Sequence, residues 1–315
     1  MTTSLKRNGE TVFVTGATGY VGSVVSERLQ AAGYNVRGLT RRQEEADILK
    51  QKGIEPFVGD VRDRDQMAKA AEGTSAIVHT AAPNDPTAEG GMEKMIAGAV
   101  QALEIMADVA EVNNARALMT SGTSIYGHTG GKTANETTPP QAMPGTEPLK
   151  ELEIRLAESG QAHFIRLGVV YGRDESAPMR KFIESIRNRE KPALVNPANR
   201  LSLVQIEDLA DLYLAILEAD APPPIINAVS EVLTWSDVAE AIANSAGVSD
   251  QPDIIPPNDA MMLGGPAIFM PIDMSVSSDF ARSTLGWKPS RPTFKESMEK
   301  SSEPPAASKE AAPNP

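Results

Sequence analysis

The sequence predicts an α/β fold, a doubly wound parallel sheet with helices on both faces and a smaller C-terminal lobe. Short apolar, β-branched segments alternate with amphipathic stretches in the first half of the chain, which is typical of βαβ units. A glycine-rich turn follows the first segment. With 41% hydrophobic and 23% charged residues, the composition is that of a packed protein. The predicted strands are residues 11–15, 35–39, 55–58, 76–80, 117–120 and 164–167.

Two helices are placed by the spacing of their apolar residues. Val21, Val25 and Leu29 share one face of a helix after the glycine-rich turn, and Gly33 stands where a left-handed C-terminal cap belongs. A longer helix is predicted over residues 93–111, where the apolar stripe is wide enough to face more than the sheet. The first two strands are therefore joined through a helix, as parallel pairing requires.

The glycine-rich turn has glycines at positions 16, 19 and 22, between a predicted strand and a predicted helix. In that context the first glycine permits a tight turn, the second lets the backbone approach a pyrophosphate, and the third allows close packing of helix on strand. A turn without a ligand is the alternative, but the context favours a Rossmann-type dinucleotide-binding domain. The residues assigned to the cofactor from this turn are Gly16, Thr18, Gly19, Tyr20, Val21 and Gly22.

The end of the second strand predicts which dinucleotide is bound. A carboxylate there accepts a hydrogen bond from the ribose 2′-hydroxyl of NAD, whereas an arginine accommodates the 2′-phosphate of NADP. The chain reads Gly38-Leu39-Thr40-Arg41-Arg42, with no acid at the strand end. A solvated pair of charges is the alternative interpretation. The missing acid favours NADP(H), with Arg41 and Arg42 at the phosphate.

The character of the chain changes after Gly172, where prolines and longer loops become frequent. We predict an NADP(H)-binding Rossmann domain over residues 1–172, to which strands return at about 200–230. Residues 173–300 are predicted to form a smaller, interleaved substrate lobe. Residues 301–315 are rich in Pro, Ala and Ser without an apolar face, which predicts a disordered tail.

Charge and composition exclude several classes of function. The net charge of -12 opposes binding to nucleic acid and to anionic membranes. The chain has no cysteine and three histidines, so thiolate chemistry is excluded and no metal site is predicted. No apolar run approaches the roughly 20 residues that span a bilayer, and no signal peptide is recognisable. We therefore expect a cytoplasmic protein with a small-molecule substrate and neither a nucleic-acid nor a membrane partner.

Further motifs follow the glycine-rich turn in a defined order. They are Gly59-Asp60-Val61, His79-Thr80-Ala81-Ala82, SGTSIYG (121–127), RLGVVYG (166–172), LVQIEDLADL (203–212) and LGWKP (285–289). Together with TGATGYVG, they resemble the extended short-chain dehydrogenase/reductase family, the group of NAD-dependent epimerases and dehydratases, over about residues 10–296. Several ordered motifs are more specific than one glycine-rich turn.

The resemblance implies further contacts with the cofactor. The residues that it adds to the cofactor site are Asp60, Val61, Thr80, Ala81, Ala82, Gly168 and Val169. Of these, Asp60 and Val61 are expected to border the adenine. Residues 168–170 are expected to close on the nicotinamide side.

The chain departs from the family where chemistry is expected. Active members use a YxxxK pair, in which the lysine lowers the pKa of a tyrosine that exchanges a proton with the substrate. No YxxxK occurs here. Lys150 keeps the place of the lysine, but Thr146 stands where the tyrosine is expected. Alignment on Tyr126 likewise puts Gly122 at the position of the family's catalytic hydroxyl group.

The side chains that remain for catalysis are Ser121, Thr123, Tyr126 and Lys150. Ser124 and His128 are further neighbours. Each has a plainer interpretation, since Tyr126 suits packing at the edge of the sheet and His128 suits a solvated loop. Lys150 is placed either on a solvent-facing helix surface or, as the resemblance implies, at the nicotinamide ribose.

Three hypotheses about function follow. The first is an NADP(H)-dependent oxidoreductase acting on a carbonyl, alcohol or activated double bond of a small organic substrate, with a nearby hydroxyl group or a bound water as the proton partner. The second is a redox-neutral enzyme of the epimerase or dehydratase type. The third is a non-catalytic regulatory protein that senses NADP(H). We favour the first because the C-terminal lobe is larger than a sensor needs.

The apolar stripe of residues 93–111 also bears on assembly. With a helix predicted near residues 149–158, it matches the pair of helices that members of the family use for twofold dimers. We therefore predict a homodimer.

Overall fold

The computed structural model of the chain describes residues 9–81, 91–173, 177–189, 192–263 and 265–301. Its largest element is a seven-stranded sheet in the order β10-β6-β5-β4-β1-β2-β3, in which every neighbouring pair is parallel. Its strands are β1 (Thr11–Thr15), β2 (Asn35–Thr40), β3 (Glu55–Val58), β4 (Ala76–His79), β5 (Arg116–Gly122), β6 (His163–Leu167) and β10 (Ile225–Ala228). The predicted doubly wound fold class is confirmed, and β1 and β3 coincide with the predicted strands.

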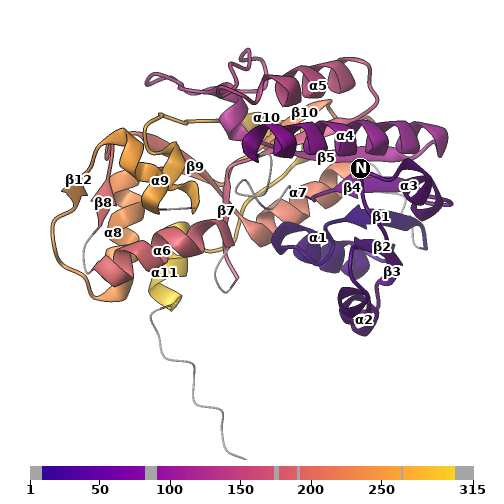
Figure 1. Cartoon of the computed structure of the whole chain (residues 1–315), viewed down its shortest axis with the longest axis horizontal. Helices are drawn as coiled ribbons and strands as arrows, with labels where there is room; N and C mark the ends of the chain where they lie inside the picture. Colours follow the sequence, from indigo (N-terminus) through magenta and orange to yellow (C-terminus); the bar gives the residue numbers. More distant parts are fainter. Residues whose placement is uncertain (1–8, 82–90, 174–176, 190–191, 264, 302–315) are drawn as a thin grey trace, which may run out of the picture.

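Helices cover both faces of this sheet (Figure 1). One face is covered by α1 (Tyr20–Ala31) and α7 (Ile206–Glu218), which pack on each other. The other is covered by α3 (Arg64–Ala70), α4 (Gly91–Val112) and α5 (Glu147–Glu158). The strand order reverses between β1 and β4, and ligands of such sheets bind beyond the carboxyl ends of the strands at that point.

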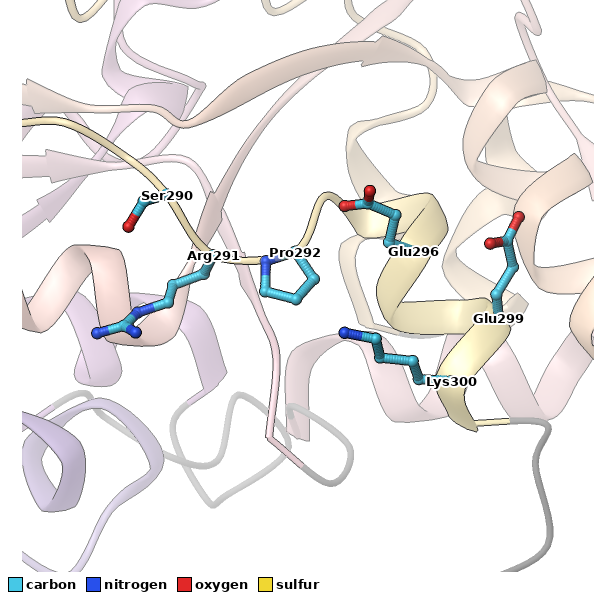
Figure 2. A pocket seen from close by; sticks show the side chains of 6 residues that line it. All are labelled: Ser290, Arg291, Pro292, Glu296, Glu299 and Lys300. Atoms are coloured by element: carbon cyan, nitrogen blue, oxygen red, sulfur yellow. The ribbon is translucent and has the colours of Figure 1, made fainter.

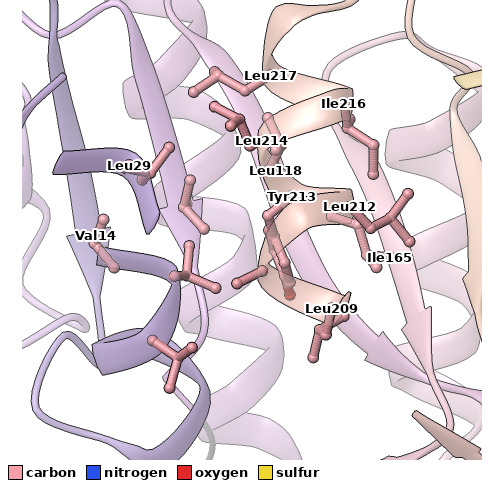
Figure 3. Close-up of a cluster of buried hydrophobic side chains, with 14 of the residues drawn as sticks. Val14, Leu29, Leu118, Ile165, Leu209, Leu212, Tyr213, Leu214, Ile216 and Leu217 are labelled. Atoms are coloured by element: carbon pink, nitrogen blue, oxygen red, sulfur yellow. The ribbon is translucent and has the colours of Figure 1, made fainter. Parts of the chain in front are cut away.

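An apolar cluster fixes the pair α1 and α7 against the sheet (Figure 3). Its labelled members are Val14, Leu29, Leu118, Ile165, Leu209, Leu212, Tyr213, Leu214, Ile216 and Leu217. Tyr213 is buried, and its hydroxyl lies 2.6 Å from Thr120 Oγ1, so its polar atom is satisfied. The cluster therefore sets the direction of α1, whose first turn lies at the carboxyl end of β1.

The second lobe has its own sheets and its own core. It contains the three-stranded sheet β11-β9-β7 and the two-stranded sheet β12-β8. Phe182 and Trp235 meet edge to face in its core, with ring centroids 5.6 Å apart. The elements of the lobe are β7 (Val169–Tyr171), α6 (Ala177–Arg189), β8 (Ala193–Leu194), β9 (Arg200–Gln205), β11 (Glu231–Thr234), α8 (Trp235–Ala246), β12 (Asp253–Ile254), α9 (Ala260–Leu263) and α11 (Phe294–Ser301).

The chain crosses between the two lobes more than once. Strand β10 lies in the main sheet, although β9 before it and β11 after it belong to the second lobe. Helix α10 (Asp279–Leu285) packs back against β10 and α7. The exact domain boundary stays a prediction. All but the first residue of the predicted tail lies outside the described residues.

Asp273 ties the loop after β5 to the second lobe. Its buried carboxylate accepts hydrogen bonds from Arg200 Nε at 2.8 Å and Nη2 at 2.6 Å, from Thr129 Oγ1 at 2.8 Å and from the Gly131 amide at 2.9 Å. The same guanidinium donates to the Lys132 carbonyl oxygen at 2.9 Å. The hydrogen bonds from Arg200 are the main reason why the pKa of Asp273 lies well below its ordinary value.

The variant Asp273→Asn tests this tie. We expect a loss of about 2 kcal/mol in the free energy of unfolding at pH 7, because Arg200 loses its charged partner. A carboxyl group whose pKa is lowered by folding contributes stability above its unfolded pKa and loses that contribution as the pH falls. The gap between variant and wild type should therefore narrow below about pH 4. Urea unfolding at pH 7 and pH 3 measures the difference in free energy of unfolding between wild type and variant. An equal difference at both pH values would contradict the stabilising role given to the Asp273 carboxylate.

Candidate functional site

The glycine-rich turn between β1 and α1 is closely packed against the end of β4. Gly16 has a φ of +73°, which favours glycine, and a Cβ atom on it would lie 2.9 Å from the Ala81 amide nitrogen. A Cβ atom on Gly22 would lie 2.1 Å from the Gly16 carbonyl oxygen and 2.5 Å from Thr80 Oγ1. The turn therefore has no room for a side chain at either position.

The start of α1 is suited to an anion. Gly19 is the N-cap residue, no side chain caps the helix, and the first turn carries no acidic residue. Thr18 and Gly19 are exposed, whereas Tyr20 and Val21 are half-buried. A helix start presents backbone amides and a partial positive charge, which favour a phosphate group. The close-packed turn and the uncapped helix together fit the pyrophosphate of a dinucleotide.

Thr80 holds the end of β4 against the same turn. Its Oγ1 donates a hydrogen bond to the Thr15 carbonyl oxygen at 2.7 Å. The preceding residue, His79, places Nδ1 2.8 Å from Thr15 Oγ1, and burial lowers the pKa of this imidazole to about 4. Ala81 is half-buried, and Ala82 lies outside the described residues. A neutral histidine thus joins β1 to β4 beneath the crevice.

The end of β2 holds an acid that sequence analysis missed. Glu45, in the first turn of α2 (Gln43–Gln51), accepts a hydrogen bond from the buried Thr40 hydroxyl. It also pairs with Arg42, whose Nε lies 3.1 Å from Glu45 Oε1. Arg41 is exposed, and its side chain forms no hydrogen bond or ion pair with a residue that the structure describes. At this strand end Arg42 therefore forms an ion pair with Glu45, whereas Arg41 acts on Glu45 and Asp60 through its charge alone.

The loop after β3 lies beside this strand end. The Gly59 amide donates to the Thr40 carbonyl oxygen at 2.9 Å. Asp60 binds the guanidinium of Arg62, with Nη2 2.6 Å from Oδ2, and this hydrogen bond is the main cause that lowers the pKa of Asp60. Val61 is half-buried against the core. The contact of Asp60 and Val61 with an adenine stays a prediction.

Two of the predicted catalytic residues belong to a buried polar network. Glu153, on α5, accepts hydrogen bonds from the Ser121 hydroxyl and, at 2.6 Å, from Arg166 Nε. Arg166 Nη1 donates to the Tyr126 hydroxyl at 2.7 Å, which in turn donates to Asn227 Oδ1 at 2.9 Å. Burial raises the pKa of Tyr126, whose side chain is 2% exposed. A proton transfer by Ser121 or Tyr126 would have to break this network first.

Thr123 and Lys150 are placed differently. Thr123, in the short 3-10 helix η1 (Thr123–Tyr126), is buried, and Lys150 is half-buried on α5. The polar side-chain atom of neither residue is bonded to a residue within the described ranges. The Thr146 hydroxyl lies in the turn before α5 and donates a hydrogen bond to the Met143 carbonyl oxygen at 2.8 Å. Among the four predicted catalytic residues, Thr123 and Lys150 thus form no side-chain hydrogen bond with a described residue, and of these two only Lys150 is partly exposed.

Gly168 and Val169 pack at the start of the second lobe. A Cβ atom on Gly168 would lie 2.7 Å from the Ser202 carbonyl oxygen, and its amide donates to the Ala228 carbonyl oxygen at 3.0 Å. Val169 packs against the apolar core of that lobe. These contacts account for both residues, and their approach to a nicotinamide stays a prediction.

The glycine-rich turn also contacts the entry to the second lobe. The Tyr20 hydroxyl donates to the Gly172 carbonyl oxygen at 2.6 Å. Arg173, with a φ of +44°, pairs with Glu27 at 2.7 Å and with Glu207 at 2.9 Å. The first residues of the lobe are thus tied to α1 and α7. A ligand at the turn would lie next to the lobe.

A separate hollow of about 480 Å³ lies between residues 290–292 and the helix α11 that follows them (Figure 2). It is lined by Ser290, Arg291, Pro292, Glu296, Glu299 and Lys300. No residue of the glycine-rich turn borders it, so the cofactor is not assigned to it. Within the described ranges, no cluster of three or more acidic or histidine side chains is arranged to hold a metal ion. The described helices include none that is long and apolar enough to cross a membrane.

The parallel sheet, the close-packed glycine-rich turn and the uncapped helix start together are typical of dinucleotide-binding proteins. The model of the NAD dependent epimerase/dehydratase family matches residues 12–228. The chain belongs to this family and is an atypical member of the extended short-chain dehydrogenases/reductases, because it lacks the YxxxK pair.

Known proteins resemble the chain to different extents. The uncharacterized protein C2A9.02 of Schizosaccharomyces pombe is 28% identical over 290 residues, which cover 90% of this chain and 96% of that protein. A 4-hydroxy-2-methyl-3-oxo-4-farnesyl-3,4-dihydroquinoline-1-oxide ketoreductase of Stigmatella aurantiaca is 34% identical over 70 residues, or 22% of this chain and 21% of that enzyme. The Thermus thermophilus UDP-glucose 4-epimerase in complex with NAD superimposes with a TM-score of 0.72 at 22% identity, covering 92% of this chain and 96% of that one. At this identity the superposition shows the fold alone.

The variant Arg166→Met tests the buried network. It leaves the carboxylate of Glu153 buried without its ion-pair partner, so we expect the free energy of unfolding to fall by about 3 to 5 kcal/mol. The matched control is Arg155→Met, which removes an exposed ion pair with Glu104 and should cost under about 1 kcal/mol. Urea denaturation measures both losses. Equal losses in the two variants would contradict the role given to Arg166.

Proposed function

We propose that the protein binds NADP(H) at the glycine-rich turn and transfers a hydride between the nicotinamide and a carbonyl, alcohol or activated double bond of a small organic substrate. The observation that carries the proposal is a close-packed turn at the start of α1, together with Arg41 at the end of the neighbouring strand β2, an arginine that forms no hydrogen bond or ion pair with a described residue. The cofactor, when bound, supplies the hydride chemistry. The protein supplies placement and exclusion of water.

The chain's own residues have separate tasks in this proposal. Gly19 and the start of α1 hold the pyrophosphate, and the forked donors of Arg41 hold the 2′-phosphate. Lys150 binds the nicotinamide ribose, and Thr123 orients the reacting oxygen of the substrate. Because a threonine hydroxyl is a poor acid, a bound water supplies the proton. Turnover is therefore expected to be slower than in enzymes that keep the YxxxK pair.

The relatives support parts of the proposal. The ketoreductase is named for a reaction on a carbonyl group, and it matches 22% of this chain. The superimposed epimerase was solved with NAD, so membership in the family does not by itself select the phosphorylated dinucleotide. The support for NADP(H) comes from the positive charge of Arg41 and Arg42, which follow β2.

A second candidate is a sensor that binds NADP(H) without turnover. The observation that favours it is the buried network, which engages the hydroxyl groups of Ser121 and Tyr126. The two candidates share the cofactor site and differ in chemistry.

The test of the proposed function combines binding with turnover. Titration of the protein with NADPH should give saturable quenching of protein fluorescence or a calorimetric signal. Addition of a panel of aldehydes, ketones and enones should then oxidise bound NADPH, followed by absorbance at about 340 nm. Binding without oxidation across the panel supports the sensor. Absence of NADPH and NADH binding refutes the dinucleotide site.

The variant Arg41→Ala tests the phosphate contact. Loss of a charge-assisted hydrogen bond should weaken NADPH binding by about 10-fold or more and leave NADH binding nearly unchanged. The control is Arg64→Ala, which removes an exposed arginine that pairs with Asp108 on α4. Calorimetric titration with both dinucleotides measures the effect. A parallel loss for NADPH and NADH would argue against contact with the 2′-phosphate.

The homodimer and the cytoplasmic location stay predictions. The apolar residues of α4, among them Ile96, Leu103 and Met106, are buried within the same chain. On the outer side of this helix pair, Glu104 and Arg155 form an exposed ion pair. The apolar stripe is therefore accounted for without a second copy.

A further inference from the structure

Glu45 brings a carboxylate to the end of β2, although it is not on the strand. It follows the end of β2 by five residues and belongs to the first turn of α2. The hydrogen bond from Thr40, the last residue of β2, brings its carboxylate back to the strand end. Its side chain is 22% exposed, so the carboxylate is held and still reachable by a ligand.

The chemistry of a held carboxylate at this position discriminates between the two dinucleotides. It accepts a hydrogen bond from the ribose 2′-hydroxyl of NAD, and it repels the 2′-phosphate of NADP. The hydrogen bond from Thr40 is the largest influence that lowers the pKa of Glu45, and Arg42 adds to it. The carboxylate is therefore ionised at neutral pH.

The pairing with Arg42 adds a second effect. Arg42 donates through Nε and Nη2 to the same carboxylate oxygen of Glu45. A 2′-phosphate would have to compete with Glu45 for this guanidinium, whereas Arg41 forms no hydrogen bond or ion pair with a described residue and acts on Glu45 and Asp60 through its charge alone. One arginine thus favours the phosphate while the acid and its partner oppose it.

We propose that Glu45 sets the dinucleotide preference, so that the chain binds both NAD(H) and NADP(H) and prefers NADP(H) less strongly than its arginine pair suggests. The proposal rests on the dinucleotide site proposed above. Glu45 replaces the missing strand-end acid in space, from a different position in sequence. The hydroxyl of Thr40 and the guanidinium of Arg42 position it.

The experiment compares Glu45→Gln with Glu44→Gln. Glutamine keeps the size of the side chain and an oxygen that accepts from Thr40, so the local fold is retained. Glu44 lies in the same turn, is exposed, and forms no hydrogen bond or ion pair with a described residue, so its variant removes the same charge as a control. Dissociation constants of NADPH and NADH are measured by calorimetric titration for the wild type and both variants.

We expect Glu45→Gln to tighten NADPH about 10-fold and to weaken NADH several-fold, while Glu44→Gln changes the ratio of the two constants by less than about 2-fold. An equal change in both variants would mean a general charge effect and would overturn the proposal. So would an unchanged ratio in Glu45→Gln. If the wild type bound neither dinucleotide, the proposed function itself would fail, which is a different result from an unchanged ratio.

Discussion

The close contact between the glycine-rich turn and the end of β4 is the constraint on which the candidate site depends. Because Gly22 has no side chain, α1 begins against the Gly16 carbonyl oxygen and beside Thr80. The same contact places the start of α1 next to the carboxyl end of β4. Helix α1 then packs on α7, and Tyr20 at its start bonds to Gly172 at the entry to the second lobe. A shift of the turn would therefore be transmitted to the lobe.

The region after β5 contains a buried polar network, although the tyrosine of the family's YxxxK pair is absent. An ion pair between Glu153 and Arg166 is buried there, with the Ser121 hydroxyl hydrogen-bonded to Glu153 and the Tyr126 hydroxyl hydrogen-bonded to Arg166. A buried charge is tolerated only when it is paired and hydrogen-bonded. These polar side chains therefore serve the stability of the sheet edge.

Much of the fold followed from the sequence, because strand and helix periods are local signals. The apolar, β-branched residues 11–15 are followed by a helical spacing of apolar residues and then by a second apolar segment at residues 35–39, which is typical of a βαβ unit. The steric role of Gly16 and Gly22 was equally accessible, since it depends on the absence of a side chain. The identity of their neighbours at the end of β4, Thr80 and Ala81, comes from the tertiary structure.

The site was harder to predict where the deciding contact is tertiary. Glu45 is not recognisable from the sequence as a strand-end acid, because it lies on α2 and reaches Thr40 only in the folded structure. The engagement of Tyr126 depends on Arg166 and Asn227, which lie 40 and 101 residues further along the chain. Neither contact has a spacing signal. A prediction of the cofactor from the residues at the end of the strand alone therefore omits Glu45, the acid proposed to oppose the 2′-phosphate.

A crystal structure of the chain with NADPH tests the central claim most directly. The account predicts the pyrophosphate at the start of α1, against Gly19, with the 2′-phosphate beside Arg41 and next to Glu45. A dinucleotide bound elsewhere, such as in the hollow lined by Arg291 and Lys300, would contradict it.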